Sequence, residues 1–222
     1  MRTYLSMSNF LKALVLGLVA TVMSVPRLIQ GGLPLGLYVP ATLVGMMLVS
    51  GAATAWSDQG GMCGMFPARR RMLIGVGIAV LVSAMATPVV HWWVDPSVRK
   101  ALVATGNPHV MALRYPATIG GCLAVVLWSA GFETLFFQAA TLSFFARLIG
   151  RQSVAIVLTV ALRLCVSLHQ MTELGVVDAV PLMLVCTAAM ATVACILFAR
   201  TGLVATMFLG AGLELHLFLS RT

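Results

Sequence analysis

The stretch Ala117–Phe145, ATIGGCLAVVLWSAGFETLFFQAATLSFF, decides the fold of this chain. Its only charged residue is Glu133, which lies near the middle. An α-helix rises about 1.5 Å per residue, so roughly 20 apolar residues cross the hydrocarbon core of a bilayer. The stretch is longer than that and therefore predicts a membrane-spanning helix with one carboxylate inside the membrane.

Six further apolar runs have the same character. The chain of 222 residues is 60% hydrophobic and 9% charged, with a mean hydropathy of +1.02. A soluble domain carries roughly 25% charged residues, so lipid has to replace water around this one. We therefore predict an all-α, polytopic transmembrane helix bundle of about seven spans, within a range of six to eight. The other six runs are Phe10–Val25, Leu33–Trp56, Met72–Val94, Ser153–Leu168, Ala179–Ala199 and Leu203–Leu219.

The connections between the runs are short and show no linker, so residues 1–222 are expected to form a single integral membrane domain. Pro26 is expected to end the first span, because proline removes a helix hydrogen bond. Ser57–Arg71 and Asp95–Pro116 are predicted to be loops, the second being the longest. Gln170–Asp178 is predicted to be a short connection between two late helices.

The net charge of +8 comes from basic residues at the ends of apolar runs, as in membrane proteins, and not from a basic face for nucleic acid. With seven spans, eight Lys and Arg residues fall on the side of the N-terminus and five on the other. The positive-inside rule then predicts a cytoplasmic N-terminus. We expect a multi-pass integral protein of a bacterial inner (cytoplasmic) membrane. The five cysteines show no CxxC spacing and predict neither a disulfide framework nor a zinc site.

Five ionisable residues lie inside the predicted spans, where such groups are costly and usually functional. Three of them, Glu133, His169 and His216, lie at a common depth of roughly 20–24 Å from one face, by the rise of a helix. Two structural alternatives remain open at this point. Each histidine is equally explained as an interhelical hydrogen-bonding residue, and Glu133 as half of a salt bridge with Arg163. Glu214, the fifth residue, has no predicted role.

Three short motifs in the second half of the chain resemble those of the CPBP family, the intramembrane glutamic proteases of the CAAX-prenyl-protease and bacteriocin-immunity type. Gly131–Ala139, GFETLFFQA, resembles the family's EExxxR motif, with Thr134 and Gln138 at the second Glu and the Arg. Cys165–His169 resembles FxxxH, and His216–Ser220 resembles HxxxN with Ser for Asn. The resemblance covers residues 117–220.

The resemblance implies a set of roles for these residues. Glu133 would act as the general base that activates a water molecule, and His169 would orient that water. His216 and Ser220 would form an oxyanion hole. Thr134 and Gln138 would support the motif through a neutral hydrogen bond in place of an ion pair. Such a protease requires no metal or other cofactor.

We therefore expect an intramembrane endopeptidase that cleaves a membrane-associated protein or peptide. The alternative is a catalytically silent membrane subunit that binds a partner protein with the same helices. A proton-coupled transporter is a further alternative, although the chain shows no inverted repeat. The separation of Glu133, His169 and His216 distinguishes these hypotheses.

Overall fold

The computed structural model describes residues 7–57, 62–173 and 180–220, and the described residues contain helices and no strand. Six helical segments are long and apolar enough to cross a membrane, and Leu203–Leu219 forms a shorter apolar segment. The prediction of an all-α polytopic bundle is confirmed, and six long spans lie at the lower end of the expected range. The helices are α1 (Met7–Gln30), α2 (Leu35–Trp56), α3 (Arg69–Val89), η1 (Val90–Val94), α4 (Asp95–Ala104), α5 (Pro108–Arg114), α6 (Ile119–Trp128), η2 (Ser129–Thr141), α7 (Leu142–Ile149), α8 (Gln152–Glu173), α9 (Val180–Thr201), α10 (Leu203–Leu213) and α11 (His216–Leu219).

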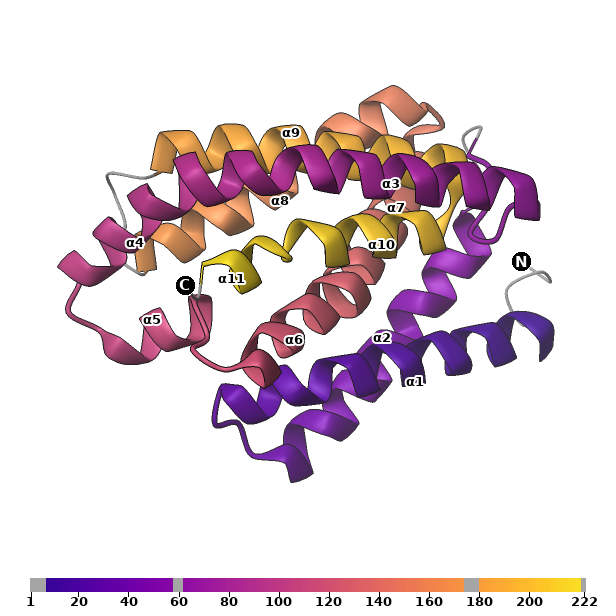
Figure 1. Cartoon of the computed structure of the whole chain (residues 1–222). Coiled ribbons are helices and arrows are strands. Elements are labelled where there is room, and N and C mark those ends of the chain that lie inside the picture. Colours follow the sequence, from indigo (N-terminus) through magenta and orange to yellow (C-terminus); the bar gives the residue numbers. More distant parts are fainter. Residues whose placement is uncertain (1–6, 58–61, 174–179, 221–222) are drawn as a thin grey trace.

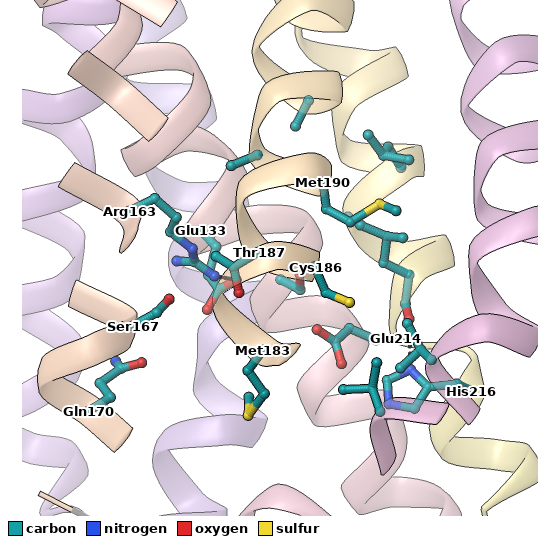
Figure 2. Close-up of a pocket in the computed structure, with 18 of the residues that line it drawn as sticks. Glu133, Arg163, Ser167, Gln170, Met183, Cys186, Thr187, Met190, Glu214 and His216 are labelled. Carbon is teal, nitrogen blue, oxygen red and sulfur yellow. Dashed lines mark hydrogen bonds and ion pairs between the residues drawn. The ribbon is translucent and has the colours of Figure 1, made fainter. Parts of the chain in front are cut away.

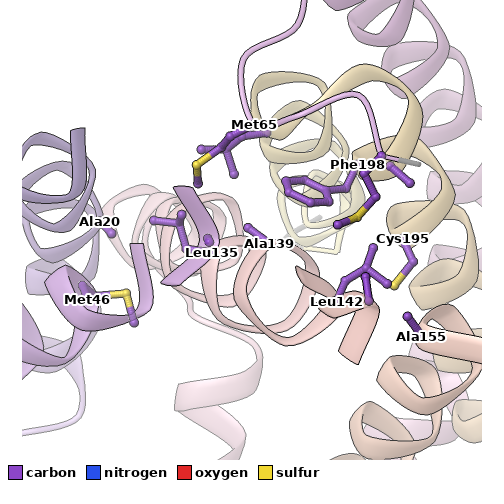
Figure 3. Packing of buried hydrophobic residues seen from close by; sticks show 14 residues of the cluster. Ala20, Met46, Met65, Leu135, Ala139, Leu142, Ala155, Cys195 and Phe198 are labelled. Atoms are coloured by element: carbon purple, nitrogen blue, oxygen red, sulfur yellow. The ribbon is translucent and has the colours of Figure 1, made fainter. Parts of the chain in front are cut away.

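The continuous unit α6–η2–α7 runs through the middle of the bundle, between the α1–α2 pair and the group formed by α3, α8, α9 and α10 (Figure 1). Its buried side chains join the two halves into one core (Figure 3). On one side Leu135 and Ala139 pack with Ala20 and Met46, and on the other Leu142 packs toward α8 and α9. The element that carries Glu133 is therefore held from both sides.

Small residues allow α3 and α10 to approach each other closely. Gly75, Ala79, Ser83 and Ala86 form the buried face of α3, and Gly212 of α10 lies directly against Ser83. Such small-residue contacts are the usual way in which helices associate in lipid, where burial of apolar surface supplies little driving force. This packing fixes α10, and with it the two residues Glu214 and His216 that follow.

A glycine with positive φ sets the sharp junction between α9 and α10. Gly202 has φ +81°, a conformation that favours glycine, and a Cβ atom there would lie 2.7 Å from the backbone oxygen of Met65. The segment before α3 is bonded across this junction, through Cys63 N to Ala199 O at 2.9 Å and Leu203 N to Met65 O at 3.0 Å. The Ala199–Leu203 stretch is therefore a packed corner.

Three of the expected boundaries differ from those in the structure. Helix α1 continues through Pro26 to Gln30, since membrane helices tolerate the lost hydrogen bond that a proline brings. Asp95–Pro116 was predicted to be a loop, which is wrong for most of its length, because α4 and α5 occupy it. Proline in the first turn and the Asn107 side chain, which accepts from the backbone at the start of α5, explain these helices. The predicted connection Gln170–Asp178 is helical to Glu173, and residues 174–179 lie outside the described part.

Candidate functional site

A cavity of about 280 Å³ lies among α8, α9, α10, η1, α4 and η2. Its apolar walls come mainly from η1, α4 and α9, and its polar wall comes from η2, α8 and the end of α10. Four charged side chains line it: Arg114, Glu133, Arg163 and Glu214. Figure 2 shows the last three of them. This cavity is therefore a partly polar compartment within a bundle of apolar helices.

Glu133 forms an ion pair with Arg163 of α8 at the wall of the cavity. The distance from Arg163 Nη2 to Glu133 Oε2 is 2.8 Å, and the two side chains are 23% and 27% exposed. The guanidinium also lies over the Phe137 ring, with its central carbon 4.3 Å from the ring centre. Glu133 Oε1 has no hydrogen-bond partner among the described residues and remains available for water in the cavity.

The helix around Glu133 is wound as a π-helix, η2, a rare form that is often found at functional sites. The Thr134 hydroxyl donates to Ser129 O at 3.0 Å, five residues back, whereas Thr159 in the α-helix α8 donates four residues back. The Gln138 amide, oriented to donate, reaches the backbone oxygens of Glu133 at 2.8 Å and Thr134 at 3.2 Å. Thr134 and Gln138 both line the cavity, but each side chain bonds to the backbone and not to the other.

His169 does not lie with Glu133. It is exposed on α8 and does not line the cavity, whereas Ser167, Gln170 and Met171 of the same helix do. Successive residues of an α-helix are rotated by about 100°, so the position two residues after Ser167 points away from the cavity. Counting residues along the helices gave the depth of each side chain but not the direction in which it points around the helix axis. That direction decides which side chains meet.

His216 does line the cavity, and it is 4% exposed. Its Nδ1 lies 2.7 Å from the backbone oxygen of Leu213, which can only accept, so Nδ1 carries a proton. Nε2 lies 3.4 Å from Asp95 Oδ1 and has no hydrogen bond of good geometry among the described residues. Both ring nitrogens therefore face partners that orient the imidazole.

Asp95, at the start of α4, is the centre of a buried polar cluster. Tyr115 Oη donates to Oδ1 at 2.9 Å and Ser220 Oγ donates to Oδ2 at 3.0 Å, in addition to the contact with His216. Burial raises the pKa of the Tyr115 phenol, so this group stays protonated and remains a donor. Arg99 adds a hydrogen bond from Nη2 to the Ser220 backbone oxygen at 2.7 Å. Ser220 is thus part of a clamp on the C-terminal helix and does not point at Glu133.

The structure brings Glu133 and His216 to one cavity and leaves His169 and Ser220 outside its lining. It adds Asp95, Arg114, Arg163 and Glu214 to the candidate residues. Arg163 and Glu214 had a signal in the sequence, as ionisable residues within apolar runs. Asp95 and Arg114 had none, because they belong to a polar stretch that was interpreted as a loop. Within the described residues no group of three or more His, Cys, Asp or Glu side chains is arranged to hold a metal.

No protein-family model, curated protein or solved structure matches the chain.

Proposed function

We propose that this protein is an intramembrane hydrolase of a bacterial cytoplasmic membrane that cleaves peptide bonds in a membrane-associated protein, with Glu133 as the general base. The observation that carries the proposal is the position of the Glu133 carboxylate. It borders a polar cavity inside the bundle with one oxygen held by Arg163 and the other free for water.

The chemistry needs a base, a water molecule and a donor for the developing oxyanion. Glu133 Oε1 takes a proton from the water as its oxygen attacks the peptide carbonyl carbon. Arg163 uses one guanidinium nitrogen to hold Oε2, and its remaining N–H groups can donate to the carbonyl oxygen as negative charge develops there. Glu133 then returns the proton to the leaving amine as the C–N bond breaks.

This proposal assigns to Arg163 a role that the motif resemblance gave to other residues. The family-like motif carries an arginine at the position of Gln138, on the same helix as its glutamates. Here a guanidinium reaches Glu133 from the neighbouring helix α8. His216 contributes by forming the wall of the same cavity, and His169 has no part in the reaction.

A catalytically silent, partner-binding protein is the second candidate, and one observation favours it. Ion pairs between membrane helices also serve only to satisfy two charges that lipid cannot solvate. The direct contact at 2.8 Å between Glu133 and Arg163 fulfils that purpose without any chemistry. In this case the cavity binds a segment of another membrane protein without cleaving it.

Mapping of newly formed protein N-termini in membranes distinguishes the two candidates. Cells that produce the wild type, Glu133→Gln or Glu173→Gln are compared by mass spectrometry of membrane protein N-termini. Glu173→Gln is the matched control, because Glu173 is exposed at the end of α8 and does not line the cavity. A general base contributes on the order of 10²–10⁴-fold to the rate.

The hydrolase predicts N-termini that appear with the wild type and the control and are lost with Glu133→Gln at equal protein levels. If no N-terminus depends on Glu133, the silent candidate replaces the hydrolase. Co-purification of the same membrane protein with the wild type and Glu133→Gln would then identify the bound partner.

A further inference from the structure

Two of the charged side chains that line the cavity have no direct partner in the described part of the chain. Glu133 and Arg163 bind each other, and His216 is held by Leu213 and Asp95. Arg114 and Glu214 both line the cavity and attract each other electrostatically, but among the described residues neither side chain forms a hydrogen bond or a direct ion pair. Arg114 is exposed and Glu214 is half-buried, so both charged groups are accessible to a ligand that fills the space between them.

The surrounding structure fixes the position of both groups. Arg27 of α1 donates from Nη1 to the backbone oxygen of Leu113 at 2.7 Å, which ties the residue preceding Arg114 to the bundle. Glu214 directly precedes the clamped segment that begins near His216, and it lies between Cys186 and His216 at the cavity wall (Figure 2). The backbone that carries the guanidinium and the carboxylate is therefore held in place by contacts with the rest of the bundle.

The two groups call for opposite charges. A guanidinium binds planar or tetrahedral oxyanions such as a carboxylate or a phosphate through paired N–H donors. A carboxylate without a partner accepts hydrogen bonds from an ammonium group. The adjoining wall is apolar, formed by Val94, Val98 and Met183. A ligand that satisfies the site carries an oxyanion, a primary ammonium group and an apolar part.

We propose that Arg114 and Glu214 form a binding site for a zwitterionic group, with the oxyanion on Arg114, the primary ammonium on Glu214 and an apolar chain along η1 and α4. Arg114 is the last residue of α5, which lies in the connection between two candidate membrane spans. A phosphatidylethanolamine headgroup at the membrane surface supplies this chemistry, and a free amino acid supplies the same two charges. The site does not involve Glu133 and does not depend on the proposed hydrolysis.

Thermal unfolding of the full chain in detergent tests the site with four probes. These are the short-chain lipids dihexanoyl phosphatidylethanolamine, phosphatidylcholine and phosphatidylglycerol, together with glycine. Phosphatidylcholine has the same charges but no N–H donor, and phosphatidylglycerol has only the anion. We expect the ethanolamine lipid to stabilise at a roughly tenfold lower concentration than the choline lipid, because it donates to the carboxylate.

Variants assign this preference to the two residues. Glu214→Gln is expected to reduce the tenfold preference to about one, and Arg114→Gln to weaken stabilisation by all three lipids. Lys100→Gln is the control, since Lys100 is exposed on α4 and outside the cavity lining, and it should leave the preference unchanged.

The conservative variants Glu214→Asp and Arg114→Lys keep the charges and cover the case in which the glutamine variants fail to fold. They should retain a preference for the ethanolamine lipid. Stabilisation by glycine at the same concentrations supports the zwitterion site with a free amino acid as its ligand. Equal stabilisation by all three lipids without any effect of glycine, or a preference that survives Glu214→Gln, would overturn the proposal.

Discussion

The ion pair between Glu133 and Arg163 makes a quantitative prediction for folding. Arg163→Met removes the cation while keeping a long apolar side chain over Phe137, and it leaves Glu133 charged without its partner. Breaking a fully buried pair from one side costs about 3–5 kcal/mol. Both side chains here are about one-quarter exposed and border a cavity that admits water, so we expect a smaller loss of about 2–3 kcal/mol.

The double-mutant cycle isolates the pair from the loss of packing. Glu133→Gln leaves Arg163 without a full counter-charge, and the double variant removes both charges together. In the double variant neither charge is left without its partner. The losses of unfolding free energy in the two single variants should therefore add up to about 1–3 kcal/mol more than the loss in the double variant. The free energy of unfolding is measured by denaturant titration in detergent micelles.

The matched control is the pair Arg151→Gln and Glu173→Gln. Arg151 directly precedes α8, Glu173 is its last residue, and both are exposed. Their losses should be small and additive. Additive losses in the cycle of Glu133 and Arg163 as well would show that no energetic coupling joins them. The assignment of Arg163 as the residue that orients the proposed base would then fail.

Three further predictions concern the clamp, the packing and the topology. Asp95→Ala removes the acceptor that Tyr115 and Ser220 share, so it should lower the free energy of unfolding by about 3–5 kcal/mol. Tyr115→Phe removes one donor and should lower the free energy of unfolding by only about 1 kcal/mol. Equal losses for the two variants in thermal or denaturant unfolding would refute the central position of Asp95. Gly210→Ala places a Cβ atom 3.0 Å from Thr134 Oγ1 and should lower the free energy of unfolding by about 1–3 kcal/mol. Gly45→Ala is the control, because the space around Gly45 is open, and it should leave the free energy of unfolding unchanged in the same measurement. A reporter protein that fluoresces only in the cytoplasm should be bright when it is fused to the N-terminus. Fused to the C-terminus, it should be bright if the chain crosses the membrane six times and dark if Leu203–Leu219 completes a seventh crossing, because six crossings place both ends on one side.

The apolar runs predicted the helices because hydrophobic length is a property of sequence alone. The run that contains Glu133 was predicted as a single crossing, and α6–η2–α7 is one continuous helical segment. The helices α4 and α5 could not be predicted from hydropathy, because their helical form depends on proline at the first turn and on the cap formed by Asn107.

The candidate site was predictable only in part. Depth within a span follows from counting residues, and on this basis Glu133 and His216 were placed at one level, where the structure has them lining one cavity. Rotation about the helix axis depends on packing, so the outward position of His169 was not visible in the sequence. Arg163 was considered as a salt-bridge partner of Glu133, and this contact is present at 2.8 Å.

The π-winding of η2 makes the position of Glu133 depend more on the number of residues in this segment than on which residues they are. Both Thr134 and Thr141 bond to the carbonyl five residues back, so the turn around Glu133 holds more residues than an α-helical turn. After deletion of one residue between Gln138 and Thr141, keeping the π-winding would rotate the helix that follows by roughly a quarter of a turn, whereas adopting α-helical winding would change the turn that carries Glu133. Either Leu142 and Ala146 would then leave the core or Glu133 would turn away from its cavity. Evolution can therefore exchange side chains along this segment more freely than it can lose a single residue from it.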